Sequence, residues 1–132
     1  MVRAVAVGLI VAIVLAGCQR ADDPRCQARV DLLKAAALIE RADAAERAGD
    51  DDAVRQAIDG AEDLLSTART RLRSAYPEGS DGPVRRMTEA ANYLGFITEG
   101  FAETGAVDGT LVQFAVRELN RPGAGDATPM NC

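Results

Sequence analysis

The chain has no histidine and no tryptophan, and Lys34 is the one lysine among its 15 basic residues. Without histidine there can be no Ser-His-Asp triad and no Cys-His nucleophile pair, because both use imidazole as the general base. Imidazole is also missing as a ligand, and three cysteines are few for a zinc site made of thiolates. These absences exclude the commonest hydrolytic and zinc chemistries.

Patterns for calcium and phosphate sites are also missing. Asp50-Asp51-Asp52 lacks the spaced Asp-x-Asp-x-Asp-Gly ligands of a calcium loop, and helix capping explains the run better. No glycine-rich phosphate-binding loop is visible, and Gly105, Gly109, Gly123 and Gly125 are typical of turns. We therefore predict that the protein is not an enzyme and holds no metal and no cofactor.

Positive charge is in deficit, with a formal net charge of -5. Proteins that bind nucleic acid neutralise phosphates with a clustered excess of basic residues. We therefore expect no nucleic-acid partner.

The most informative segment is residues 1–18. Arg3 precedes an apolar run from Val5 to Leu15, which ends in Leu15-Ala16-Gly17-Cys18. A positive start, a short apolar run and small residues before a cut are typical of a secretory signal peptide, and the run is too short to span a bilayer. The Leu-Ala-Gly-Cys ending resembles the lipobox of bacterial lipoprotein precursors. The resemblance implies that residues 1–17 are removed and that Cys18 is acylated, first with two fatty chains and usually with a third on its amino group.

The resemblance also implies a place in the cell envelope. In Gram-negative cells an aspartate directly after the lipidated cysteine favours the inner membrane, so Gln19 points to the periplasmic face of the outer membrane. In a bacterium with one membrane it implies the outer face of that membrane. Removal of the signal takes away Arg3 alone among the charged residues, which leaves 14 basic and 20 acidic residues and a net charge of -6.

Two cysteines remain for the mature domain, Cys26 near its start and Cys132 at its end. In an oxidising compartment such a pair most simply forms a disulfide. The two positions are 106 residues apart, unlike the close spacing of a redox motif. We predict a structural disulfide between Cys26 and Cys132.

Helical periodicity extends over nearly the whole mature chain, with no useful alternating strand pattern. A first helix is expected from Asp22 or Asp23 to about Ala48, ending at Gly49, with an inward stripe of apolar side chains at Cys26, Val30, Leu33 and Ala37, widened by Leu32, Ala36 and Ile39. The second follows Asp50-Asp51-Asp52, ends at Pro77 and has the clearest seam, at Val54, Ile58, Ala61, Leu65, Ala68, Leu72 and Ala75. Gly60 within it is expected to let a neighbour approach closely.

A third helix is expected from Ser80 or Asp81 to about Thr104, with inward positions at Val84, Met87, Ala91, Leu94, Ile97 and Phe101. A shorter fourth helix is predicted from Asp108 to before Pro122, and Phe114 is placed at its edge. The fold class is therefore all-α: an antiparallel up-down-up-down bundle of three long helices and one shorter helix. The domain boundaries are a signal peptide at 1–17, a short tether at 18–23, the bundle at 24–121 and an irregular tail at 122–132. Helix starts at intervals near 29 residues suggest a tetratricopeptide-like array as an alternative, but these helices are too long for it.

Alternating helix directions would separate the charges. One end of the bundle would collect basic residues at Arg25, Arg29, Arg69, Arg71, Arg73, Arg85 and Arg86, and also Arg20, Arg117 and Arg121. The other would collect Glu40, Asp43, Glu46, Asp50, Asp51, Asp52, Glu99, Glu103 and Asp108. Since the tether is short, the basic end is expected to face the membrane, where each arginine contributes about 1 kcal/mol with anionic lipid. A mixed, solvated surface is the alternative.

The sequence predicts a non-enzymatic envelope lipoprotein with a membrane anchor and a protein partner, acting in assembly or scaffolding. Pilotins, the small helical lipoproteins that escort secretin subunits, are similar in size and anchor, although no residue-level match supports the analogy. Two other functions stay open. One is a carrier of a small apolar ligand, with a pocket lined by Met87, Tyr93, Leu94, Phe96, Ile97 and Phe101. The other is a surface-exclusion lipoprotein.

Overall fold

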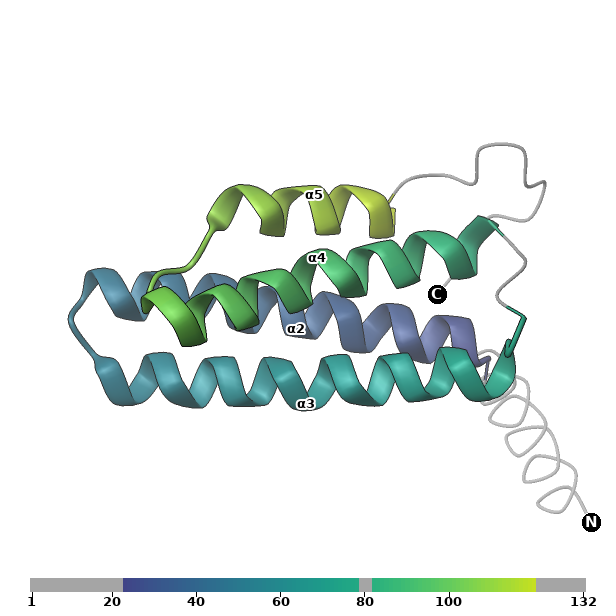
Figure 1. Ribbon diagram of the computed structural model, residues 1–132, viewed down its shortest axis with the longest axis horizontal. Helices are drawn as coiled ribbons and strands as arrows, with labels where there is room; N and C mark the ends of the chain where they lie inside the picture. Colours follow the sequence, from purple (N-terminus) through teal and green to yellow (C-terminus); the bar gives the residue numbers. More distant parts are fainter. Residues whose placement is uncertain (1–22, 79–81, 121–132) are drawn as a thin grey trace, which may run out of the picture.

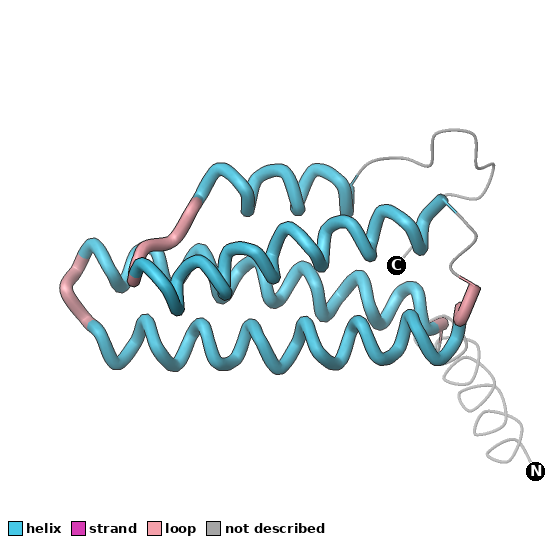
Figure 2. Tube along the Cα trace, in the orientation of Figure 1, coloured by secondary structure: helices cyan, strands magenta, loops and turns pink. Residues whose placement is uncertain are grey.

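The computed structural model describes residues 23–78 and 82–120, and four helices make up most of them. They are α2 (Pro24–Arg47), α3 (Asp51–Ala75), α4 (Gly82–Thr104) and the shorter α5 (Gly109–Asn120). No strand occurs within the described ranges. Figure 2 shows that the described loops are short compared with the helices they join. The all-α prediction is confirmed.

The helix ends follow from capping residues that the sequence provides. The carboxylates of Asp23, Asp50 and Asp108 accept hydrogen bonds from backbone amides in the first turns of α2, α3 and α5. Each satisfies an amide that has no partner within its own helix. Beyond α2 and α4, Gly49 and Gly105 have φ of 73° and 71°, the left-handed conformation that commonly ends a helix and that glycine adopts without strain. The aspartate run at 50–52 therefore caps and begins α3.

The helices alternate in direction (Figure 1). In sequence order, α2 and α3 form one antiparallel hairpin, and α4 and α5 form a second that lies against it. Helix α2 contacts all three other helices, whereas α3 contacts α2 and α4 but not α5. Because α5 is about half as long as its neighbours, it covers part of the α2 and α4 surfaces and leaves α3 open on its far side.

The core is built mainly of alanine, leucine, isoleucine and valine from all four helices. Six of the seven residues of the predicted seam in α3 are buried, from Val54 to Leu72, while Ala75 is exposed. A Cβ atom added at Gly60 would lie 3.1 Å from Leu38 Cδ1, so the expectation that this glycine permits a close neighbour is confirmed. No helix of the described residues is long and apolar enough to cross a membrane.

The inward face predicted for α2 is wrong in part. Val30 is 39% exposed, Ala37 is exposed and Leu33 is half-buried, whereas the fully buried residues of this helix are Ala28, Leu32, Ala35, Ala36, Ile39 and Ala42. The sequence shows apolar residues at both sets of helical positions. Because α2 is surrounded by three helices, its buried surface is wide and is centred on Leu32 and Ile39. The partner helices, not the periodicity, select between the two stripes.

The cap of α2 leads to a stability prediction. Asp23 Oδ1 accepts from the Arg25 amide at 2.9 Å, and the Arg25 guanidinium beside the carboxylate lowers the pKa of Asp23. Replacing Asp23 by alanine is expected to lower the free energy of unfolding by about 1 kcal/mol at pH 7, the usual value of an N-cap. Urea unfolding of the two proteins measures it.

Asp23→Asn is the matched control, because it keeps a capping oxygen and removes the charge. A carboxyl whose pKa is lowered by folding stabilises the protein above its unfolded pKa, and the contribution is lost as the pH falls through the folded value. The difference between wild type and Asp23→Asn is therefore expected at pH 7 and should vanish well below about pH 4. A difference that persists unchanged in acid would contradict this ion pair.

Candidate functional site

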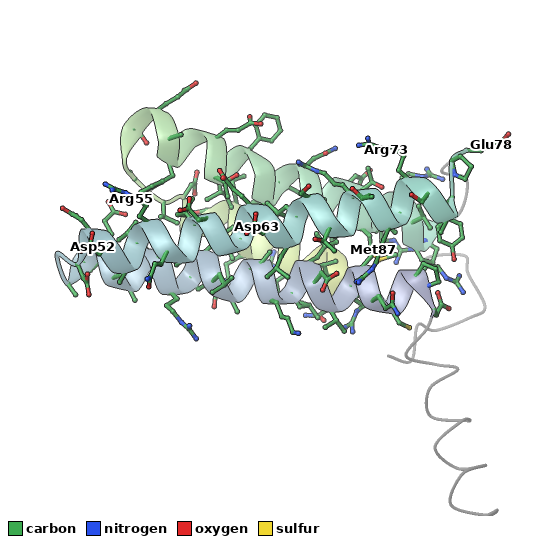
Figure 3. All side chains as sticks on the ribbon, turned by 90° about the horizontal axis from the view of Figure 1, so that it is seen from below. Asp52, Arg55, Asp63, Arg73, Glu78 and Met87 are labelled. Carbon is green, nitrogen blue, oxygen red and sulfur yellow. The ribbon has the colours of Figure 1, made fainter. Side chains whose placement is uncertain are left out.

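The residues predicted to form a basic end come from the start of α2, the end of α3 and the start of α4, which the antiparallel order brings to one end of the bundle (Figure 1). Figure 3 labels Asp52 and Arg55 near one end and Arg73 and Glu78 near the other, so each end carries charges of both signs. Most of the predicted arginines, however, are already in contact with protein atoms. Their partners show what they do for the fold.

Arg29 joins the second turn of α2 to the last turn of α5. Its Nε donates to the Leu119 carbonyl at 3.0 Å and its Nη2 donates to Asn120 Oδ1 at 2.9 Å. The last carbonyls of a helix have no intrahelical donor and carry the negative end of the helix dipole. An arginine near the start of α2 is unfavourable for its own helix, but here its guanidinium caps the antiparallel neighbour.

The opposite end has the complementary contact. Glu46, in the last turn of α2, accepts a hydrogen bond from the Val107 amide at 3.3 Å, just before α5 begins. Together Arg29 and Glu46 hold both ends of the shortest helix against α2. Arg29 and Glu46 lie at ends of α2 where the helix dipole disfavours their charges. Each instead forms a hydrogen bond with another segment of the bundle.

Arg71 and Arg69 connect α3 to its two neighbours. Arg71 Nη1 forms an ion pair with Asp31 on α2. Arg69 Nη2 donates to the Ala91 carbonyl on α4 at 3.0 Å. A Cβ atom at Gly95 would lie only 2.4 Å from that same nitrogen. Gly95 therefore makes room for the Arg69 guanidinium between α3 and α4.

This contact predicts different effects of alanine substitution at two glycines of α4. Gly100→Ala meets no atom within 4 Å and is expected to raise the free energy of unfolding by about 0.5–1 kcal/mol, because alanine favours helix more than glycine does. Gly95→Ala is expected to raise the free energy of unfolding by less than Gly100→Ala does, or to lower it. The added methyl group would push the Arg69 guanidinium away from the Ala91 carbonyl. Thermal unfolding of the two variants measures the difference. Equal stabilisation by both would contradict the packing of Arg69 against Gly95.

The remaining arginines of the predicted basic end differ in exposure. Arg25 pairs with Asp23 at 3.2 Å, and Arg86 is half-buried. Arg73 and Arg85 are exposed. Arg20 and Arg121 lie outside the described residues. The surface open to an external anion at this end is thus smaller than the seven predicted side chains imply.

Of the three cysteines, only Cys26 lies within the described ranges. It is half-buried in the first turn of α2 and takes part in a disulfide bond. The lipidation prediction at Cys18 and the pairing prediction for Cys132 fall outside the described residues, and neither is tested.

The six residues predicted to line an apolar pocket lie on different faces of α4. Met87, Leu94 and Ile97 are buried in the core, whereas Tyr93 is 37% and Phe96 is 65% exposed. Phe101 is half-buried. These residues therefore do not surround one cavity.

An exposed aromatic surface takes the place of that pocket. The rings of Tyr93 and Phe114 lie 6.5 Å apart across α4 and α5, a distance typical of paired aromatic side chains. Phe96 follows Tyr93 by one turn of α4, and Phe114 is 48% exposed. We call Tyr93, Phe96 and Phe114 the aromatic surface. The sequence could have indicated this surface, because all three residues lie outside the apolar stripes of their helices.

Within the described residues, no group of three or more cysteine, aspartate and glutamate side chains is placed to hold a metal ion. No family model matches the chain, and neither the curated proteins nor the solved structures contain a match to it. The site is therefore argued from its own residues.

Proposed function

We propose that this protein is a lipid-anchored envelope lipoprotein without enzymatic activity, which holds a protein partner near the membrane during assembly. The observation that carries the proposal is the sequence Leu15-Ala16-Gly17-Cys18 at the end of an apolar run. Acylation at Cys18 would leave five residues, Gln19 to Asp23, before α2 begins. They span at most about 18 Å when extended, so the start of α2 would lie close to the membrane.

In this proposal the aromatic surface binds the partner. An exposed phenylalanine loses hydrophobic stabilisation that burial would supply, and here two of them lie beside a tyrosine in a chain of which only 4% is aromatic. Aromatic side chains are also the residues that most often dominate protein interfaces. The packing of α4 against α5 brings the Tyr93 and Phe114 rings to 6.5 Å from each other. These features support a protein partner over a soluble metabolite.

In the same proposal Cys26 pairs with Cys132. Such a bond would fasten the carboxyl-terminal residues to the start of α2, at the end of the bundle that the tether reaches. Closing so long a loop stabilises a domain by about 2–4 kcal/mol. The pairing would leave Cys18 free for acylation, so the two parts of the proposal are consistent.

The test is crosslinking in intact cells followed by affinity purification of the full chain. We expect one envelope or secretory protein in stoichiometric yield. Truncating an aromatic residue that dominates an interface costs about 2 kcal/mol or more, so Phe96→Ser is expected to lower the yield at least about tenfold. Val30→Ser is the matched control, because Val30 is also exposed and apolar but lies on α2. Its yield should equal that of wild type.

Other results of this purification would contradict the proposal. Recovery of the protein with a bound apolar molecule and no partner would favour the carrier. Cleavage by protease added outside intact cells, again without a partner, would favour a surface-exclusion lipoprotein. Equal yields from Phe96→Ser and wild type would remove the aromatic surface from the interface.

A further inference from the structure

The second hairpin does not close tightly on the end of α3, and a groove lies between α3 and α4 there. Its volume is about 230 Å³. From α3 it is lined by Arg69, Leu72, Arg73 and Tyr76, and from α4 by Val84, Thr88 and Asn92. We call it the α3–α4 groove.

The groove is hollow because of the residues that face it on α4. Val84, Thr88 and Asn92 follow one another at intervals of four, so they form one ridge along the helix. All three side chains are short. The longer side chains of α4, such as Met87 and Leu94, are directed into the core instead. The ridge therefore leaves a gap opposite α3.

Chemically the groove is divided into a floor and a rim. Leu72 and Val84 are buried and form an apolar floor, 4% and 2% exposed. Arg73, Thr88 and Asn92 are exposed and form a polar rim, while Arg69 and Tyr76 are half-buried between them. Among the residues that the structure describes, no aspartate or glutamate lines the groove. In a chain with 20 acidic residues and a net charge of -5, this is a local excess of two positive charges.

The two guanidinium groups also have hydrogen-bonding capacity to spare. A guanidinium has about five N–H donors, and the hydrogen bond recorded for Arg69 uses one, to the Ala91 carbonyl. Arg69 has no ion pair with a carboxylate of residues 23–78 or 82–120, unlike Arg71 beside it in sequence, which pairs with Asp31. Arg73 likewise forms no hydrogen bond or ion pair within those ranges. A half-buried cation without a counter-charge is electrostatically unfavourable, and a bound anion would relieve it.

We propose that the α3–α4 groove binds a phosphate group through Arg69 and Arg73, with the Tyr76 and Asn92 side chains as further polar contacts. Arginine suits phosphate because its planar fork donates two parallel hydrogen bonds to two oxygens. The apolar floor beside the arginines fits the first carbons of an attached chain. The phosphate is therefore that of a lipid headgroup or a free phosphate, and the two sources differ in whether the floor contributes. The proposal does not rest on the lipid anchor or on a protein partner.

The test uses the fluorescence of Tyr76 in the full chain, kept in solution by a non-ionic amphipol. The chain has two tyrosines and no tryptophan, so in the background of Tyr93→Phe the emission comes from Tyr76 alone, inside the groove. Three probes are titrated: hexyl phosphate, inorganic phosphate and the uncharged hexyl glucoside. We expect saturable binding of hexyl phosphate and none of hexyl glucoside. If inorganic phosphate binds at least about tenfold more weakly than hexyl phosphate, a difference of about 1.4 kcal/mol, the ligand is a lipid headgroup. If the two bind equally, the ligand is free phosphate.

Two variants connect the signal to the groove. Arg73→Gln is expected to raise the half-saturating concentration about tenfold, the effect of one charged contact, and Thr88→Leu is expected to abolish binding by filling the space. Arg55→Gln is the matched control, since Arg55 is an exposed arginine on the same helix near the opposite end (Figure 3). Circular dichroism confirms that each variant is folded. The proposal is overturned if hexyl phosphate causes no saturable change, or if Arg73→Gln and Arg55→Gln behave alike.

Discussion

Replacing Cys18 by serine is expected to abolish incorporation of a fatty-acid analogue into this protein and to block removal of residues 1–17. A hydroxyl cannot form the thioether that lipoprotein acylation requires. Each buried methylene contributes about 0.8 kcal/mol to membrane attachment, so that one chain anchors a protein only marginally whereas two or three anchor it stably. Metabolic labelling followed by gel electrophoresis measures both effects. A variant that keeps the label would refute the lipobox interpretation.

The same samples test the disulfide independently of acylation. After digestion without reductant, we expect the peptide containing Cys26 to be joined to the one containing Cys132, in wild type and in Cys18→Ser alike. Cys26→Ser is the control that should release Cys132 as a free thiol. A bond between Cys26 and Cys18 in wild type would contradict both the pairing and the acylation, because a cysteine in a disulfide has no thiol to acylate.

Replacing Leu32 by alanine is expected to lower the free energy of unfolding by about 2–5 kcal/mol, the range for a buried leucine whose loss leaves a cavity. Leu32 is 0% exposed and lies in α2, which contacts all three other helices. Neighbours on three sides limit collapse into the space. Since a domain of this size is stable by about 5–15 kcal/mol, the loss is a large share of the total. Thermal and urea unfolding of the full chain measure it.

Val30→Ala is the control, because the apolar stripe of the sequence includes Val30 while the structure leaves it 39% exposed. We expect a change within about 0.5 kcal/mol, as for other surface substitutions. If Val30→Ala destabilises as much as Leu32→Ala, then α2 is rotated relative to the structure described here, and its inward face is the one that periodicity suggested.

The helix boundaries could be predicted because they depend on local chemistry. Asp23, Asp50 and Asp108 cap helices with their own carboxylates, and Gly49 follows the end of α2 within one turn. The buried seam of α3 was predictable for a related reason, since its other face consists almost entirely of polar residues and offers no competing stripe. Helix α2 has apolar side chains on several faces, so its orientation depended on the number of helices around it.

The arginines show most clearly what sequence reasoning missed. Charge patterning predicted that they gather at one end, and it described them together as a membrane-facing surface. Their separate uses depend on atoms far away in the chain: Arg29 on the carbonyl of Leu119, Arg71 on Asp31, and Arg69 on the space left by Gly95. No spacing within one helix indicates such partners. The candidate groove arises in the same way, from two helices whose facing residues are distant in sequence.

The sequence by itself determined the helices and their order, because capping and periodicity each act over a few neighbouring residues. It also predicts acylation at Cys18, which stays a prediction. The tertiary structure alone decided which face of α2 is buried and which arginines bind other parts of the protein. It also decided that Tyr93 and Phe114 lie together on the surface. Those outcomes depend on how helices pack. Packing is set by the combined shape and charge of several helices, which no short stretch of the chain contains.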